Sequence, residues 1–145
     1  MIRQARDERG SASIEVAIGL PAFILFVGLI IAGGRLALAH QALQTAAADA
    51  ARSASIARDA GSADSAARRE AHNSLSNQNL RCRSTDVRID TSGFRVPTGR
   101  PADVRVTLTC RVDLADLSVP GVPGSRLITA TMISPIDTWR ERGPS

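Results

Sequence analysis

The stretch that decides the fold is residues 16–34, VAIGLPAFILFVGLIIAGG, which contains no charged residue. As an α-helix that rises about 1.5 Å per residue, this stretch would be roughly 28 Å long. That length matches the hydrocarbon core of a bilayer, which is about 30 Å thick. A chain of 145 residues has no core large enough to bury such a helix on every side. The stretch therefore predicts a helix that spans a membrane.

Arginines flank this apolar stretch unequally. Arg3, Arg6 and Arg9 precede it, whereas only Arg35 follows it closely. Basic residues near a first hydrophobic segment tend to stay on the cytoplasmic side of the membrane. We therefore expect a single-pass protein of the cell membrane, with its N-terminus in the cytoplasm and its C-terminus outside the cytoplasm.

Three residues within the apolar stretch are candidates for helix packing in the membrane. Pro21 removes the helical hydrogen bond to the carbonyl of residue 17, which favours a kink. Gly28 and Ala32 stand four residues apart and form a small-xxx-small pair. Such a pair lets two helices approach closely within a bilayer.

An alanine-rich segment follows Arg35 and lacks proline, which predicts that the first helix continues to about Arg58. Gly61 is expected to end this first helix. A second helix is expected to begin with Ser62 or Asp64 as its cap and to run to about Ser76. The small or apolar residues expected to face the domain core recur at helical spacing, at Leu36, Leu43, Ala47 and Ala50.

Beyond residue 81 the apolar period changes from that of a helix to that of a strand. Residues Val104–Leu114 alternate strictly between apolar and polar, which predicts a half-buried antiparallel strand. Shorter strands are expected at Asp86–Thr91 and Leu127–Ser134. The predicted fold is α+β: a long N-terminal helix whose first half spans the membrane, a second short helix, and a three-stranded antiparallel sheet packed on the helices.

Two cysteines, Cys82 and Cys110, lie at the edges of the first strand connection. Outside the cytoplasm a disulfide between them is favoured, and it would close a loop of about 28 residues. Two unpaired buried thiols are the alternative. The two histidines, His40 and His72, have no Cys or carboxylate at metal-ligand spacing along the chain. The sequence thus predicts neither a metal site nor a cofactor.

The composition argues against two classes of function. All eighteen basic residues are arginines, and they are spread along the chain beside fourteen acidic residues. Without a basic cluster we expect no nucleic-acid partner. The common nucleophile, metal-protease and nucleotide-binding motifs are absent from the sequence, so we expect no enzyme.

A second signal precedes the apolar stretch. Residues 1–10, MIRQARDERG, form a short basic leader that ends at Gly10, and Ser11 follows. A cut between Gly10 and Ser11 would make Glu15 the fifth residue of the mature chain. This arrangement resembles the class III signal of type IV pilins and pseudopilins. Alternatively, Glu15 is a boundary residue that complements the positive end of the helix dipole.

Longer stretches resemble the TadE-like family of the Tad (Flp) pilus system. They are RGSASIEVAIGLPAFILFVGLI at residues 9–30, GRLALAHQALQTAAADAARSASIA at residues 34–57 and, more weakly, a strand with a cysteine followed by PIDTWRE at residues 135–141. The resemblance implies a pilin-like fold and a minor pseudopilin that a prepilin peptidase cuts between Gly10 and Ser11. It further implies that Glu15 pairs with the new amine of a neighbouring subunit, and that the protein assists or joins surface fibres used in adhesion.

The expected partners are therefore the prepilin peptidase, other pilins or pseudopilins, the pilus assembly machinery and the lipid bilayer. The expected organisation is a cytoplasmic leader at 1–10, a transmembrane helix part at 11–39, alanine-rich extracytoplasmic helices at 40–80 and a sheet region at 81–145. Two alternatives remain. One is an unprocessed, signal-anchored extracytoplasmic binding module. The other is a secreted domain cut after Ala39, where Ala37-Leu38-Ala39 fits a signal-peptidase pattern.

Overall fold

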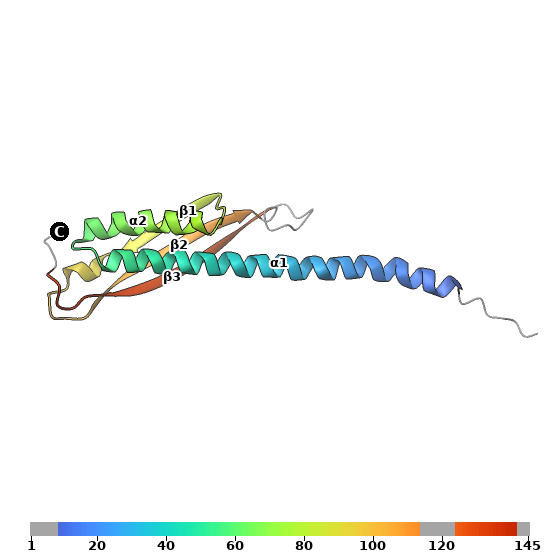
Figure 1. Cartoon of the computed structure of the whole chain (residues 1–145), viewed down its shortest axis with the longest axis horizontal. Coiled ribbons are helices and arrows are strands. Elements are labelled where there is room, and N and C mark those ends of the chain that lie inside the picture. The colour runs from blue at the N-terminus through green and yellow to red at the C-terminus, as the bar shows by residue number, and fades with distance from the viewer. Residues whose placement is uncertain (1–8, 114–123, 142–145) are drawn as a thin grey trace, which may run out of the picture.

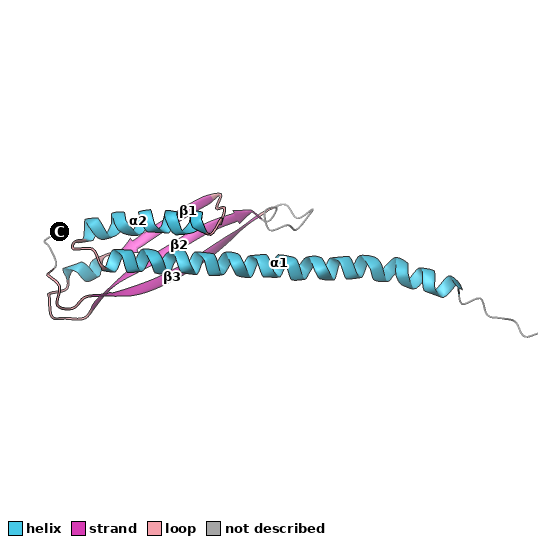
Figure 2. Ribbon diagram, in the orientation of Figure 1, coloured by secondary structure: helices cyan, strands magenta, loops and turns pink. Residues whose placement is uncertain are grey.

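The computed structural model describes residues 9–113 and 124–141, and for residues 9–15 it describes the backbone alone. Figure 2 distinguishes the helices, drawn in cyan, from the strands, drawn in magenta. The elements in chain order are α1 (Arg9–Ser55), α2 (Ala60–Asn77), β1 (Ser84–Asp90), the short 3-10 helix η1 (Ser92–Arg95), β2 (Ala102–Asp113) and β3 (Ser125–Ile136). The predicted α+β class, with a long helix, a short helix and an antiparallel sheet, is confirmed.

The first helix, α1, has 47 residues and continues through Pro21 as one helix. Its second half packs within a domain (Figure 1). Its first half projects away from that domain, and no other described element packs against it. The helix ends three residues earlier than Arg58, the expected end. The chain turns here, where the amide of Ala57 donates to the carbonyl of Ala54 at 3.1 Å.

The start of α2 corrects the prediction for this connection. The cap of α2 is Asp59, not Ser62 or Asp64, and Gly61 lies in the first turn of α2 rather than ending α1. Asp59 has an extended backbone, so its Oδ1 accepts from the amide of Ser62 at 2.8 Å, while its Oδ2 accepts from the Ser62 hydroxyl at 2.7 Å. These two bonds lower the pKa of Asp59, the backbone bond having the larger effect.

Within the described residues, the strands form an antiparallel sheet in the order β1-β2-β3. Each strand begins two residues before its predicted start, and β3 also ends two residues later than predicted. β1 ends at Asp90, so Thr91, which was predicted in this strand, lies just before η1, and Leu114 lies outside the described residues. The predicted alternation in β2 is confirmed, because alternate residues of this strand are buried from Val104 to Val112. The opposite face is polar, and on it Thr107 and Thr131 pair across β2 and β3 with their hydroxyl oxygens 3.0 Å apart.

The core lies between the buried face of the sheet and the two helices. α1 contacts β2 and β3, and α2 contacts α1 and β1. Most of the helix residues in the core are alanines, whose small side chains permit close packing. Of the stripe predicted on α1, Leu43, Ala47 and Ala50 are fully buried, and Leu36 is half-buried at the margin of the core.

Candidate functional site

The exposed first half of α1 is the most unusual surface of the molecule. Its large apolar side chains point away from any protein contact, as in Ile18, 70% exposed, and Leu29, 72% exposed. No residue in the most apolar part of the helix is buried. Among the described residues one helix, α1, is long and apolar enough to cross a membrane. An uncovered apolar surface of this length requires lipid or neighbouring helices to shield it from water.

The residues predicted to pack in the membrane all lie on this exposed half. Pro21 and Gly28 are exposed, and Ala32 is partly covered. A Cβ added to Gly28 would meet no atom within 4 Å. The flat surface at Gly28 is therefore open to a second helix, and packing there stays a prediction.

The predicted processing residues lie together at the end of α1 that is remote from the domain (Figure 1). Gly10 and Ser11 are in the first turn, because the helix begins at Arg9. Glu15 follows one turn later. Positions 11 and 15 are four residues apart, so they share one side of the helix backbone. Their part in processing and assembly stays a prediction.

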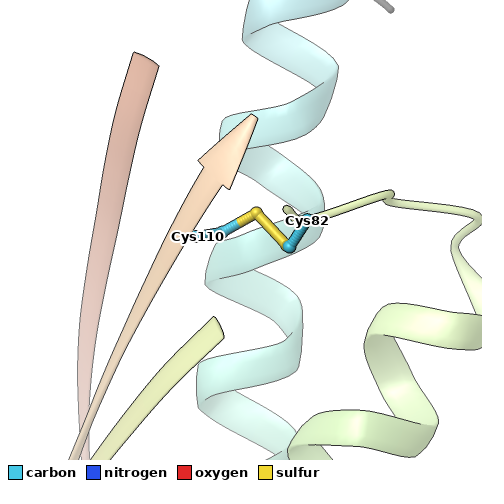
Figure 3. Close-up of a disulfide and its surroundings, with 2 residues drawn as sticks. All are labelled: Cys82 and Cys110. Atoms are coloured by element: carbon cyan, nitrogen blue, oxygen red, sulfur yellow. A yellow bond between two sulfur atoms is a disulfide. The ribbon is translucent and has the colours of Figure 1, made fainter. Parts of the chain in front are cut away.

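The two cysteines lie together and form a disulfide, drawn in Figure 3. Cys82 precedes β1 and Cys110 lies in β2, and their Cα atoms are 5.4 Å apart. Cys110 is fully buried and Cys82 is half-buried against the core. The bond ties the segment that follows α2 to the central strand of the sheet.

Several polar contacts that no sequence signal revealed hold later parts of the chain to α1 or to the residue that follows it. The hydroxyl of Ser74 in α2 donates to Oδ2 of Asp49 at 2.8 Å. The hydroxyl of Ser134 in β3 donates to that of Ser55 at 3.0 Å, and Nη1 of Arg140 donates to the carbonyl of Ile56 at 2.6 Å. The two partners of each bond are between 25 and 84 residues apart in the sequence. Patterns among neighbouring residues therefore do not predict these hydrogen bonds.

Both histidines are exposed on helices, His40 on α1 and His72 on α2. Among the residues that the structure describes, no three His, Cys, Asp or Glu side chains gather as a metal site would require.

The family model described as TadE-like protein matches residues 10–52. The resemblance predicted from the sequence is confirmed for this segment. The match begins at Gly10, spans the whole apolar half of α1 and ends at Arg52, close to the end of that helix. It does not extend over α2 or the sheet. No curated protein and no solved structure matches this chain.

Proposed function

We propose, from the TadE-like match over residues 10–52, that this chain is a minor pseudopilin of a Tad (Flp) type IV pilus system. The observation that carries the proposal is the division of α1 into two halves. Its second half is part of a domain core, whereas its first half exposes apolar side chains along its length. A subunit of this form is held by lipid before assembly and by the helices of neighbouring subunits afterwards.

The first step of the proposed role is processing. The arginines before the apolar stretch keep the leader in the cytoplasm, and the domain lies on the outer side. A prepilin peptidase then hydrolyses the peptide bond between Gly10 and Ser11. The products are the leader, which ends in a carboxylate at Gly10, and a mature chain with a free α-amine at Ser11. The new α-amine at Ser11 is a group that can carry a positive charge.

The second step is assembly. The mature helix leaves the lipid and enters a bundle of similar helices, where Glu15 would be surrounded by apolar side chains. A carboxylate in such surroundings needs a positive partner. Because positions 11 and 15 share one side of the helix, the Ser11 amine of one subunit can face Glu15 of the next. The role requires no catalysis by this chain.

The secreted alternative conflicts with the packing of Ala39. This residue lies inside α1, is only 5% exposed and belongs to the domain core. A cut after Ala39 would divide α1 and remove a core residue. The other alternative, a signal-anchored protein that is not processed, is not cut after Gly10. The N-terminus of the mature protein therefore distinguishes this alternative from a pseudopilin.

The test is the intact mass of the chain, recovered from the membranes and from the extracytoplasmic soluble fraction of cells that also express a prepilin peptidase. A mass beginning at Ser11 supports the proposal. A mass beginning at Met1 identifies an unprocessed anchor, and one beginning at His40 identifies a secreted domain. Gly10→Val should block the cut. Gly19→Val is the matched control, because a side chain added at Gly19 meets no atom within 4 Å.

A further inference from the structure

A cavity of about 370 Å³ lies where α1, the segment after α2 and the end of β2 meet. Two arginines and two side-chain amides line it together with apolar residues. The lining residues are Arg35, Leu38, Ala39, Ala42, Gln78, Asn79, Leu80, Arg81 and Val112. Its volume is within the range of small-molecule sites. The charged groups in this lining are two guanidinium groups, which favour an anion.

The turn after α2 places Arg81 in the lining of the same cavity as Arg35. Asn79 has a φ of 53°, a left-handed conformation that asparagine tolerates better than most residues. The turn is closed by the amide of Leu80, which donates to the carbonyl of Leu75 at 3.2 Å. Nε2 of Gln78 donates to the carbonyl of Ala42 at 3.3 Å and so attaches the turn to α1. Arg81 thereby lines the same cavity as Arg35, and both residues are exposed.

The position of the cavity along α1 indicates which kind of anion it can meet. Arg35 follows the uncharged residues 16–34 directly. If α1 spans the bilayer as proposed, Arg35 lies at the depth of the lipid head groups. Guanidinium groups bind phosphate through charge-assisted hydrogen bonds. Leu38, Leu80 and Val112 add an apolar part to the lining, which suits the glycerol and upper acyl carbons of a lipid.

We propose that this cavity binds the phosphate of an anionic phospholipid head group between Arg35 and Arg81. This inference rests on the proposed function in one respect, the insertion of α1 into a bilayer. A lipid held here fixes the depth of the domain on the membrane surface. It must be released when the subunit moves into a fibre, so binding favours the membrane-anchored state before assembly.

The experiment uses the full chain, reconstituted in vesicles that contain equal amounts of phosphatidylcholine and phosphatidylglycerol. The chain is extracted in mild detergent, and the lipids that remain bound are counted by native mass spectrometry. We expect phosphatidylglycerol to be retained in preference to phosphatidylcholine. Arg81→Gln and Arg35→Gln should each lower this preference about fivefold. Arg69→Gln is the matched control, since Arg69 is an exposed arginine of α2 that does not line the cavity.

The outcomes separate the two proposals. If Arg81→Gln retains as much phosphatidylglycerol as Arg69→Gln, the lipid site is wrong while the pseudopilin proposal stands. If inorganic phosphate displaces the lipid from the wild-type chain as readily as free phosphatidylglycerol does, the site takes free phosphate and the lipid assignment is overturned. If the wild-type chain does not insert into vesicles, the membrane anchoring fails and the lipid site fails with it. Circular dichroism of each variant verifies that the domain is folded.

Discussion

The Oγ atom of Ser74 donates a hydrogen bond to Oδ2 of Asp49 at 2.8 Å and thereby joins two helices at positions 25 residues apart in sequence. Ser74 is only 6% exposed, and its hydroxyl also accepts from Nε2 of Gln78 at 3.1 Å. A serine inside a helix usually bonds to its own backbone or to water. Here it connects α2 to the half of α1 that belongs to the domain, so it bears directly on domain stability.

Replacing Ser74 by alanine should destabilise the domain. The change leaves Asp49 and Gln78 each without one partner, which lowers the free energy of unfolding by about 1 kcal/mol. Ser76→Ala is the matched control, because Ser76 is an exposed serine of α2 and gains the same helix propensity. Urea unfolding of the full chain in detergent micelles measures both variants. Equal stabilities of Ser74→Ala and Ser76→Ala would contradict the prediction.

The disulfide between Cys82 and Cys110 should contribute strongly to stability. It closes a loop with a sequence separation of 28 residues, which corresponds to about 3–4 kcal/mol from the lower entropy of the unfolded chain. Reduction by dithiothreitol should lower the melting temperature, and Cys82→Ala should lower it to a similar degree. Cys82 is the better residue to replace, because Cys110 is fully buried in the core. Dithiothreitol should have no further effect on Cys82→Ala; a second decrease would show that reduction acts elsewhere.

Gly93 should tolerate no side chain. A Cβ at this position would lie 2.1 Å from the carbonyl oxygen of Asp103, and that atom belongs to the backbone of β2. Gly93→Ala therefore forces η1 away from the sheet and should cost about 1–3 kcal/mol or more of unfolding free energy. Gly61→Ala is the control. Gly61 lies in the first turn of α2, its added Cβ would meet the nearest atom at 3.4 Å, and alanine should be neutral or stabilising there. Similar melting temperatures for the two variants would show that the contact is not rigid.

Acid should remove part of the stability through two carboxylates. Hydrogen bonds from Ser62 lower the pKa of Asp59, and hydrogen bonds from Ser92 lower the pKa of Asp90. Since the folded pKa is below the unfolded value near 3.9, each contribution is complete above about pH 4 and is lost as the pH falls through the folded pKa.

The variants Asp59→Asn and Asp90→Asn keep an oxygen acceptor but do not titrate. Combining them should reduce the loss of stability between neutral and acidic pH, as measured by urea unfolding across that range. A double variant that loses as much stability in acid as the wild-type chain would show that other carboxylates dominate.

The features that could be predicted from the sequence are those that repeat over many neighbouring residues. The uncharged stretch 16–34 predicts the exposed helix half, and the alternation from Val104 to Val112 predicts β2 with its buried face. The cap at Asp59 was missed because Gly61 suggested an end for α1. A glycine in a first helical turn and one after a helix end look alike when the backbone is unknown.

Contacts between distant positions could not be predicted for a different reason. The pairing of Ser55 with Ser134 and the shared cavity of Arg35 and Arg81 depend on how the turns place whole elements. The turn that carries Arg81 includes Asn79 with a left-handed backbone, a conformation that the sequence does not announce by any repeating pattern. The proposed role of Gly10, Ser11 and Glu15 stays a prediction from the residue order, because the proposed chemistry would involve an enzyme and neighbouring subunits.

Substitution of Glu15 tests the proposed assembly step separately from the proposed cleavage step. If its carboxylate pairs with the Ser11 amine of a neighbouring subunit, Glu15→Ala leaves an unpartnered charge in an apolar bundle. Removing one partner of a buried pair costs about 3–5 kcal/mol, so incorporation into fibres should fall by about a hundredfold or more. The measurement is the amount of the chain in fibres sheared from the cell surface, relative to the amount in membranes. Cleavage after Gly10 should continue, which intact mass verifies.

Two further variants identify the reason for such a loss. Glu15→Gln keeps the shape of the side chain but removes its charge, so it should fail to assemble as Glu15→Ala does. Glu141→Gln is the control, because Glu141 is an exposed carboxylate after β3 and outside the helix. If Glu15→Gln enters fibres as well as the wild-type chain, the ion pair is not what holds the subunit. Glu15 would then act only as a polar boundary at the end of the apolar stretch, where its charge complements the helix dipole.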